Sequence, residues 1–570
     1  MFLTVPLRER RQGLLRMLAL VCACSALLAT GAFAQEHDSD QPDEGGDDPI
    51  ANRGDRYVPE PPGTVKKMRF WYGPYTMPAG WDMNRVDLDI PVHNGMILKV
   101  EPELRVGPDW MEPSHQVAHI HHAHWFALDP GNKEDNYTAG NTEWIFGNGD
   151  EETRADFTLR SKAQPNGPYY GEYIGLAGPQ AMIYMLHNKT AQTMVGYVAL
   201  DVTFKYGTME QLNATGREHH DIAGVLWGRT FDVPRQRKRD GNKDGSWNTT
   251  YDMRKEDGSP RPIEWVATMD GTMIGTGSHV HPGGFKVLTE NMGSEENPCP
   301  DDGRGTGGTL MLKSDIINRH TPLSEDYQTE VTRPSWRAPI HVGDRIRITG
   351  YYKNNKHAWY TAMTHNGAYI DEAQPPKGRC KPYLVGKDRK KRVRKKVRTR
   401  AGATRIVKTR LDPTEGVPNR KWGHDHDTFC GVKFGFDPCE PTFNPPPDGA
   451  PASRVTIANF QYYPGGRSAP GDMGLPPTVK QGSSLTFFNA DQQANIRHSV
   501  TTCKYPCNGR YVSNYPWADG RWDSGTLGFD AIDGGTPDPV SSTPEDLPVG
   551  KYSYFCRIHP FMRGEFRVVP

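Results

Sequence analysis

A cysteine, a histidine and a methionine stand close together near the end of the chain, in the spacing Cys556-x2-His559-x2-Met562. Alternating apolar residues on both sides predict two strands joined by this short segment. A thiolate, an imidazole and a long axial thioether are three of the four ligands of a blue-copper electron-transfer site. The fourth is a second imidazole, and His498 in an earlier predicted strand has the required type. These four residues therefore predict a type 1 copper site.

The same four residues resemble the ligands of the cupredoxins, and the short segment that carries three of them is similar to that of amicyanin or plastocyanin-like proteins. The resemblance covers residues 453–570 and implies a Greek-key β-sandwich. An insertion between Thr501 and Ser542 departs from the family pattern. The alternative interpretation is a disulfide-bonded Cys556. Because no His-Cys-His element is present, a multicopper oxidase or nitrite-reductase-like enzyme is disfavoured.

Four histidines lie within six residues of an apolar stretch, at His119, His121, His122 and His124. Strict alternation places two of them on each face of a strand. The adjacent pair His121 and His122 can still meet at one metal where the strand twists. A further imidazole, His187, follows in another apolar segment. A packed core or an adventitious metal-binding face is the alternative.

A second set of potential ligands follows about ninety residues later. His279 and His281 are separated by one residue, so a strand would present both imidazoles on the same face. Met363 lies in a later apolar stretch and supplies a soft thioether, which favours Cu(I). For this methionine alone, an ordinary place in the core is the alternative.

This order of histidines and methionine resembles the copper type II ascorbate-dependent monooxygenases, which include peptidylglycine-hydroxylating and dopamine β-monooxygenases, and the stress-upregulated nodulin-19 group. The resemblance implies two jelly-roll-like β-sandwich domains, residues 65–207 and 208–380. It implies two type 2 coppers. One would be held in the first domain by His121, His122 and His187, and the other in the second domain by His279, His281 and Met363. The extra His119 and His124 leave the first ligand set open, and the family's substrate-binding residues have no counterpart.

The start of the chain predicts export. Several arginines, an apolar run and the small-residue motif at Ala32-Phe-Ala34 indicate a signal peptide over residues 1–34, and hence a secreted or periplasmic protein. The apolar run is too short for a membrane span. Residues 35–64 are acidic and Gly-rich, as in a disordered linker. With 60 Gly and 48 Pro, the chain favours an all-β fold with many turns.

Cysteine usage agrees with export. Two of nine cysteines belong to the signal segment, and six remain beside Cys556. An even number suits disulfides in an oxidising compartment. Proximity favours the first two of the following pairs, and the third follows by elimination: Cys503–Cys507, Cys430–Cys439 and Cys299–Cys380.

Two smaller features lie in expected loops. Asp240, Asn242 and Asp244 have the spacing of the first ligands of a calcium loop, but no glutamate closes it, so a surface turn is the favoured alternative. Residues 381–452 are basic and Pro-rich and are expected to be a linker. Its run 387–400 is expected to be a solvated hairpin or an anionic docking surface. The zero net charge of the whole chain gives no global indication of nucleic-acid binding.

Together these features predict an exported, all-β copper protein of three domains. A blue-copper domain would feed electrons to a two-copper, dioxygen-dependent monooxygenase-like body that acts on a small organic substrate. A redox partner protein or a small reductant would supply the electrons. The alternative is a non-enzymatic electron carrier whose His-rich body binds or stores copper. Neither hypothesis requires a membrane span.

Overall fold

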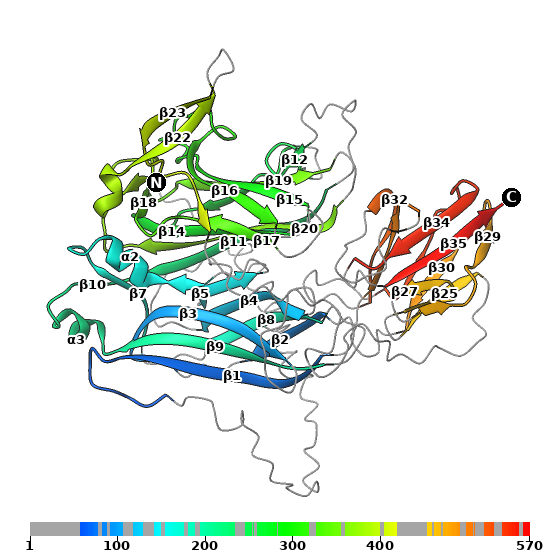
Figure 1. Ribbon diagram of the computed structural model, residues 1–570, viewed down its shortest axis with the longest axis horizontal. Coiled ribbons are helices and arrows are strands. Elements are labelled where there is room, and N and C mark those ends of the chain that lie inside the picture. The colour runs from blue at the N-terminus through cyan, green and yellow to red at the C-terminus, as the bar shows by residue number, and fades with distance from the viewer. Residues whose placement is uncertain are drawn as a thin grey trace, which may run out of the picture. The chain divides into compact units, whose positions relative to one another are not determined.

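The computed structural model shows a chain that is mostly β, with several separate sheets (Figure 1). No helix among the residues it places is long and apolar enough to cross a membrane. It describes residues 57–77, 82–87, 92–106, 118–128, 142–149, 154–175, 180–188, 194–233, 246–253, 255, 259–281, 283–318, 327–354, 359–398, 404–418, 453–458, 461–468, 471–490, 498–505, 507, 518–528, 538–557 and 562–570.

Two sheets form the first body. The larger has the strand order β1-β9-β3-β7-β10 with β6 paired to β3, and the smaller has the order β2-β8-β4-β5. Val100 and Leu200 of the larger sheet share one buried core with Trp125 and Tyr184 of the smaller sheet. The strands are Val65–Met77 (β1), Asp82–Asp87 (β2), Gly95–Val106 (β3), Ala118–Leu128 (β4), Thr142–Gly149 (β5), Ala155–Asp156 (β6), Tyr169–Ile174 (β7), Gln180–Asn188 (β8), Met194–Tyr206 (β9) and His219–Asp221 (β10).

A twelve-stranded sheet forms the second body, with the main order β11-β20-β14-β17-β16-β15-β19-β12. Val225 and Met273 near one end of this order share a core with Val287 and Ile348 near the other, so the two ends of the sheet pack face to face. Its strands are Ala223–Val233 (β11), Ser246–Asn248 (β12), Ile263–Val266 (β13), Gly271–Val280 (β14), Gly284–Asn291 (β15), Thr309–Asn318 (β16), Tyr327–Val331 (β17), Trp336–Ile340 (β18), Arg345–Lys353 (β19), Trp359–Asp371 (β20), Tyr383–Leu384 (β21) and Val417–Pro418 (β24).

The segment that we expected to be a linker is partly structured. Strands β21 and β24 pair with the second body, and Arg392–Arg398 (β22) and Thr404–Arg410 (β23) form a separate two-stranded ribbon. The 3-10 helix Gly386–Lys390 (η2) precedes the ribbon. Half-buried Val393 packs against the core of the second body, which explains why the ribbon stays ordered despite its many charges.

Two further sheets form the C-terminal domain, in the orders β26-β25-β30-β33 and β28-β27-β35-β34-β31-β32, with β29 paired to β35. Val455 and Phe487 of the first sheet meet Tyr554 and Phe566 of the second in one buried core. The strands are Arg454–Ala458 (β25), Gln461–Tyr463 (β26), Gly466–Ser468 (β27), Gly471–Met473 (β28), Thr478–Lys480 (β29), Thr486–Asn489 (β30), His498–Cys503 (β31), Ala518–Leu527 (β32), Val540–Ser542 (β33), Gly550–Phe555 (β34) and Arg563–Val569 (β35).

Two short helices accompany the first body. Asp156 caps Phe157–Ala163 (α2), where its carboxylate accepts a hydrogen bond from the backbone N–H of Leu159. Thr208 and Gln211 form a reciprocal capping box on Met209–Asn213 (α3). Such caps satisfy backbone N–H groups that a helix leaves unpaired at its start.

The structure contains two of the expected disulfides, Cys299–Cys380 and Cys503–Cys507, and it buries Cys556 as a thiol that neither disulfide includes. The remaining expected pair, Cys430–Cys439, lies outside the described residues, as do the signal segment and the calcium-loop residues Asp240, Asn242 and Asp244.

The two disulfides close loops of very different length, which makes their removal a matched test. Replacing Cys299 and Cys380 by serine opens a loop between residues that are 81 apart in the sequence. The loop-closure entropy of such a loop corresponds to a loss of about 4.5 kcal/mol in the free energy of unfolding. The same change at Cys503 and Cys507 opens a loop between residues only 4 apart and lowers the free energy of unfolding by about 2 kcal/mol. We expect guanidinium unfolding of the copper-free protein to show the larger loss for the first variant. Equal losses would contradict the entropic account.

Candidate metal centres

Imidazoles from both β bodies meet in one cluster. Three ring nitrogens, one each from His121, His122 and His281, lie within 4.8 Å of one another. A fourth ring joins them, because Nε2 of His279 lies 2.9 Å from Nε2 of His122. Three convergent imidazoles are a donor set that suits copper, zinc, iron or nickel.

A β-bulge explains how adjacent histidines of β4 converge. Against β8, Ile120 pairs with Leu186 and His122 pairs with Met185, so His121 is the extra residue. A bulge re-aims side chains that strict alternation would place on opposite faces. The rings of His121 and His122 accordingly lie with centroids 4.1 Å apart.

The second pair of imidazoles is positioned by the β14–β20 ladder. His279 is the cross-strand partner of His365, and the backbone N–H of His281 donates to the carbonyl of Met363 at 3.2 Å. Directly paired residues of neighbouring strands share a face. Val280 points to the other face. One face therefore presents His279, His281, Met363 and His365 together.

The surroundings favour neutral imidazoles. Burial, and then the neighbouring rings of His279 and His124, lower the pKa of His365 to about 3. The indole N–H of Trp144 donates to Nδ1 of His124 at 3.2 Å, which leaves the proton of that ring on Nε2. Neutral rings keep lone pairs available for a metal, whereas protonated rings at these separations would repel one another.

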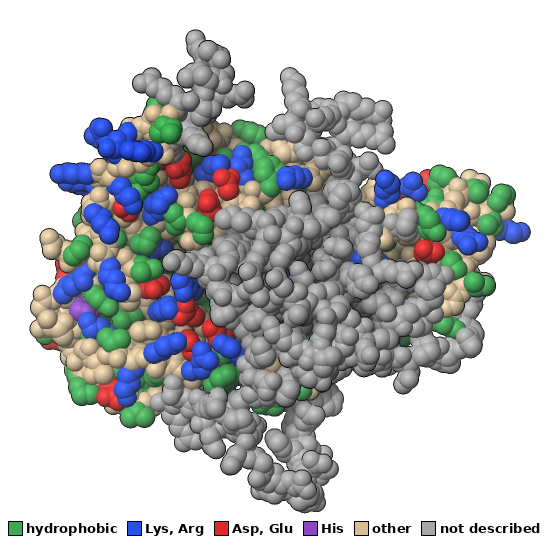
Figure 2. All heavy atoms as spheres, in the orientation of Figure 1, with side chains coloured by type: hydrophobic (Ala, Val, Ile, Leu, Met, Phe, Trp, Pro, Cys, Tyr) green, Lys and Arg blue, Asp and Glu red, His purple; other side chains and the backbone are tan. Residues whose placement is uncertain are grey.

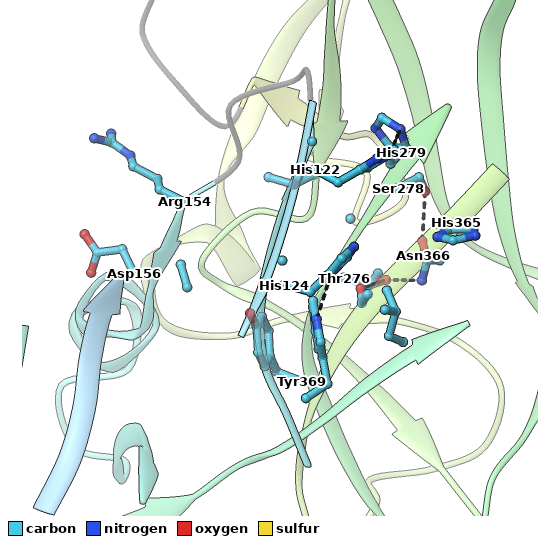
Figure 3. Close-up of a pocket in the computed structure, with 18 of the residues that line it drawn as sticks. His122, His124, Arg154, Asp156, Thr276, Ser278, His279, His365, Asn366 and Tyr369 are labelled. Atoms are coloured by element: carbon cyan, nitrogen blue, oxygen red, sulfur yellow. Dashed lines mark hydrogen bonds between the residues drawn. The ribbon is translucent and has the colours of Figure 1, made fainter. Parts of the chain in front are cut away.

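A small cavity of about 90 Å³ lies beside the cluster, where the two bodies face each other (Figure 3). His122, His279 and His365 form part of its wall. Asn366 accepts a hydrogen bond from the hydroxyl of Ser278 at 2.8 Å and donates one to Thr276 Oγ1 at 2.7 Å. These bonds fix polar side chains along the wall next to the imidazoles, so the cavity can hold a small polar or diatomic ligand.

The second centre lies in the C-terminal domain. Cys556, His498 and Met562 are all fully buried, and Sγ of Cys556 lies 3.9 Å from Nδ1 of His498. One ion bonded to both atoms spans this separation, because metal–sulfur and metal–nitrogen bonds together reach about 4.3 Å. His559 lies outside the described residues. The burial of the three side chains and the sulfur–nitrogen separation are compatible with the type 1 copper site that the sequence predicts.

Hydrogen bonds hold the sulfur of Cys556 in place. The backbone N–H of Ser499 donates to Sγ at 3.3 Å, and the hydroxyl of Ser499 accepts the backbone N–H of Arg557 at 2.8 Å. Burial, followed by the neighbouring Cys556, raises the pKa of Tyr462 well above its ordinary value. The phenol of Tyr462 donates a hydrogen bond to the backbone carbonyl of Ser499, so it helps to fix the residue whose N–H bonds the sulfur.

The structure arranges the histidines differently from the two sets that we expected. It gathers His121, His122, His279 and His281 in one cluster, and the assignment of two separate coppers stays a prediction. His187 pairs with His119 in the β4–β8 ladder, but its side chain lies outside the described atoms. Met363 lies on the face of His281.

No sequence motif singles out His365, which the structure places on the cavity wall. Its alternation with Met363 was a usable signal, since both residues then occupy one face of a strand. The sequence alone does not give the pairing register that places His365 of β20 opposite His279 of β14.

Comparisons with known proteins give only distant matches. No protein-family model and no curated protein matches the chain. Among solved structures, it is similar to a purple cupredoxin from Nitrosopumilus maritimus, with 18% identity over 20% of this chain and 99% of that chain, at a TM-score of 0.14. It is also similar to a Cu-containing nitrite reductase from Thermus scotoductus SA-01, with 14% identity over 52% of this chain and 55% of that chain, also at 0.14. Similarities this low carry no conclusion about function.

The absence of a side chain at Gly228 makes room for His365. A Cβ there would lie 1.9 Å from Cδ2 of His365 and 2.6 Å from the carbonyl oxygen of Thr364. We expect Gly228→Ala to displace the ring and to lower the free energy of unfolding by about 1–3 kcal/mol. Gly175→Ala is the control, because its nearest contact is 3.8 Å away. Thermal unfolding of both variants checks this, and equal midpoints would contradict it.

Proposed function

We propose that this chain is an exported copper-dependent oxidoreductase. In this proposal the C-terminal Greek-key cupredoxin passes single electrons to two jelly-roll-like bodies, which hydroxylate a C–H bond of a small organic substrate with dioxygen. The observation that carries it is the convergence of His121, His122 and His281 beside a cavity. The electron donor is a redox partner protein or a small reductant.

The donor sets support copper in both places. Cys556, His498, His559 and Met562 would hold a type 1 copper, and the imidazole cluster would hold type 2 copper. Copper bound in these sets supplies one-electron chemistry and the activation of dioxygen. The backbone N–H of Ser499, which donates to Sγ of Cys556, would orient the sulfur toward a bound copper.

The residues around the cluster would orient and shield a substrate. Ser278, Asn366 and Thr276 form a hydrogen-bonded row that fixes the polar side of the cavity. Trp144 stacks on Tyr369, with ring centroids 5.3 Å apart, and covers another side. His365 remains neutral at physiological pH, so its ring can accept a hydrogen bond at one nitrogen and donate one at the other.

A second candidate function is copper storage or electron transfer without catalysis. The short distance between the nitrogens of His122 and His279 and the small volume of the cavity favour it, since both leave little room for an organic substrate. In that case the C-terminal domain would be an electron carrier and the imidazole cluster a copper-binding module.

Copper content and spectra test the proposal. We expect the copper-loaded protein to show an intense thiolate-to-copper absorption band and, by electron paramagnetic resonance, a type 1 signal together with type 2 copper. Cys556→Ser should abolish the band and keep the type 2 signal. The double variant Cys503→Ser/Cys507→Ser, which removes only a disulfide, should retain the band. A band that survives in Cys556→Ser would rule out the type 1 assignment.

The imidazole cluster has its own test. His121→Ala/His281→Ala should lose at least one type 2 copper and the consumption of dioxygen by the reduced protein, while the type 1 signal persists. His341→Ala is the matched control, because this histidine bonds the carbonyl of Gly378 away from the cluster. If the wild type binds type 2 copper yet consumes no dioxygen with any reductant, copper storage or electron transfer is the better description.

A further inference from the structure

Positive charge is concentrated in one part of a chain that is neutral overall. The full sequence has 68 basic and 68 acidic residues. Residues 377–411 contain sixteen Lys and Arg but one acid, Asp388. The described residues of this segment, 377–398 and 404–411, include Cys380 of a disulfide and the ribbon β22–β23. The backbone pairing of the ribbon therefore fixes where its charged residues stand along the two strands.

The register of the ribbon sets like charges directly opposite each other. Arg392 pairs with Arg410, and Arg394 pairs with Lys408. All four side chains are exposed, while Val393 on the opposite face packs against the core of the second body. The described part of the chain places no acid within 4 Å of these four residues. Figure 2 shows Lys and Arg side chains gathered over the place where Figure 1 draws β22 and β23.

A groove continues this cationic face. It has a volume of about 420 Å³, and its lining includes five cationic side chains: Lys377, Arg379, Lys381, Arg389 and Arg410. Arg410 belongs to both features, so the ribbon and the groove are continuous. Of the five, Arg379 has an anionic neighbour, Asp344, at 3.7 Å. Among the described residues, no carboxylate forms an ion pair with the other four.

Like charges directly opposite in a strand pair destabilise a sheet. The ribbon has two such pairs in succession, and they stand beside a groove with the same sign of charge. A ligand with several negative charges in a row would neutralise them together. Charges recur at every second residue, about 6.5–7 Å apart along each strand. We propose that this cationic face binds a linear anionic polysaccharide, whose sulfate or carboxylate groups neutralise successive pairs.

The composition of the surface distinguishes this ligand from other polyanions. Residues 384–421 contain no Phe, Tyr or Trp, so the ribbon has no aromatic platform on which the bases of single-stranded nucleic acid could stack. Protein interfaces need an apolar centre. Ile406 is the one large exposed apolar side chain that the described part of the ribbon offers. The groove adds one aromatic ring, Tyr383, beside its five cationic side chains. A face with so much charge and a single aromatic ring suits a hydrated polysaccharide.

A matched pair of variants tests the proposal on the full-length protein. Arg394→Gln/Lys408→Gln removes one like-charge pair from the ribbon. Lys551→Gln/Arg567→Gln removes the same net charge from another cross-strand pair, which is followed by Ser553 opposite Glu565 instead of more cations. Binding to dextran sulfate, polygalacturonate, neutral dextran and single-stranded oligothymidylate is measured by calorimetry at several salt concentrations.

We expect the wild type to bind both anionic polysaccharides and not neutral dextran, with affinity falling as salt rises. The ribbon variant should bind about fivefold more weakly, and the control variant as tightly as the wild type. The thermal midpoint of the ribbon variant should not fall, because a repulsive pair has been removed. Equal weakening in both variants, no polysaccharide binding at low salt, or tighter binding of the oligonucleotide at equal charge would each overturn the proposal.

Discussion

The imidazole cluster depends on strand register more than on any single residue. His121 reaches the cluster because one extra residue is accommodated in β4 opposite β8. His279 reaches it from β14, and His281, directly after that strand, is held by the bond from its backbone N–H to the carbonyl of Met363 in β20. A slip of one residue in either ladder would turn these rings away from one another. The apolar cores of both bodies therefore fix the metal ligands indirectly, by fixing the registers.

Gathering neutral imidazoles in one place has an energetic cost that the fold must offset. Each ring loses hydration, and protonation is opposed by burial and by the neighbouring rings, as the low pKa of His365 illustrates. A metal ion would compensate this cost, because it takes up several lone pairs at once. The cluster is thus a site that metal binding stabilises and acid weakens.

The sequence was informative where chemistry is local and less so where it is not. Cys556 and Met562 lie within seven residues, and the structure buries both beside His498. The disulfides Cys299–Cys380 and Cys503–Cys507 could also be inferred, from parity and proximity. The contact between His122 and His279 could not be inferred, because 157 residues separate them and the contact depends on how two sheets meet.

The same distinction separates the two metal centres physically. The predicted type 1 ligands Cys556, His559 and Met562 lie within seven residues of the sequence, so a single domain can supply them. The imidazole cluster takes His121 and His122 from the first body and His279 and His281 from the second, so neither body can form it alone. Tyr369 of the second body donates to the carbonyl of Ile145 in the first, and its ring lies against Trp144 and Phe157. Contacts of this kind hold the two bodies together, and metal binding by the cluster would add to them, because an ion bound to imidazoles of both bodies links the bodies directly.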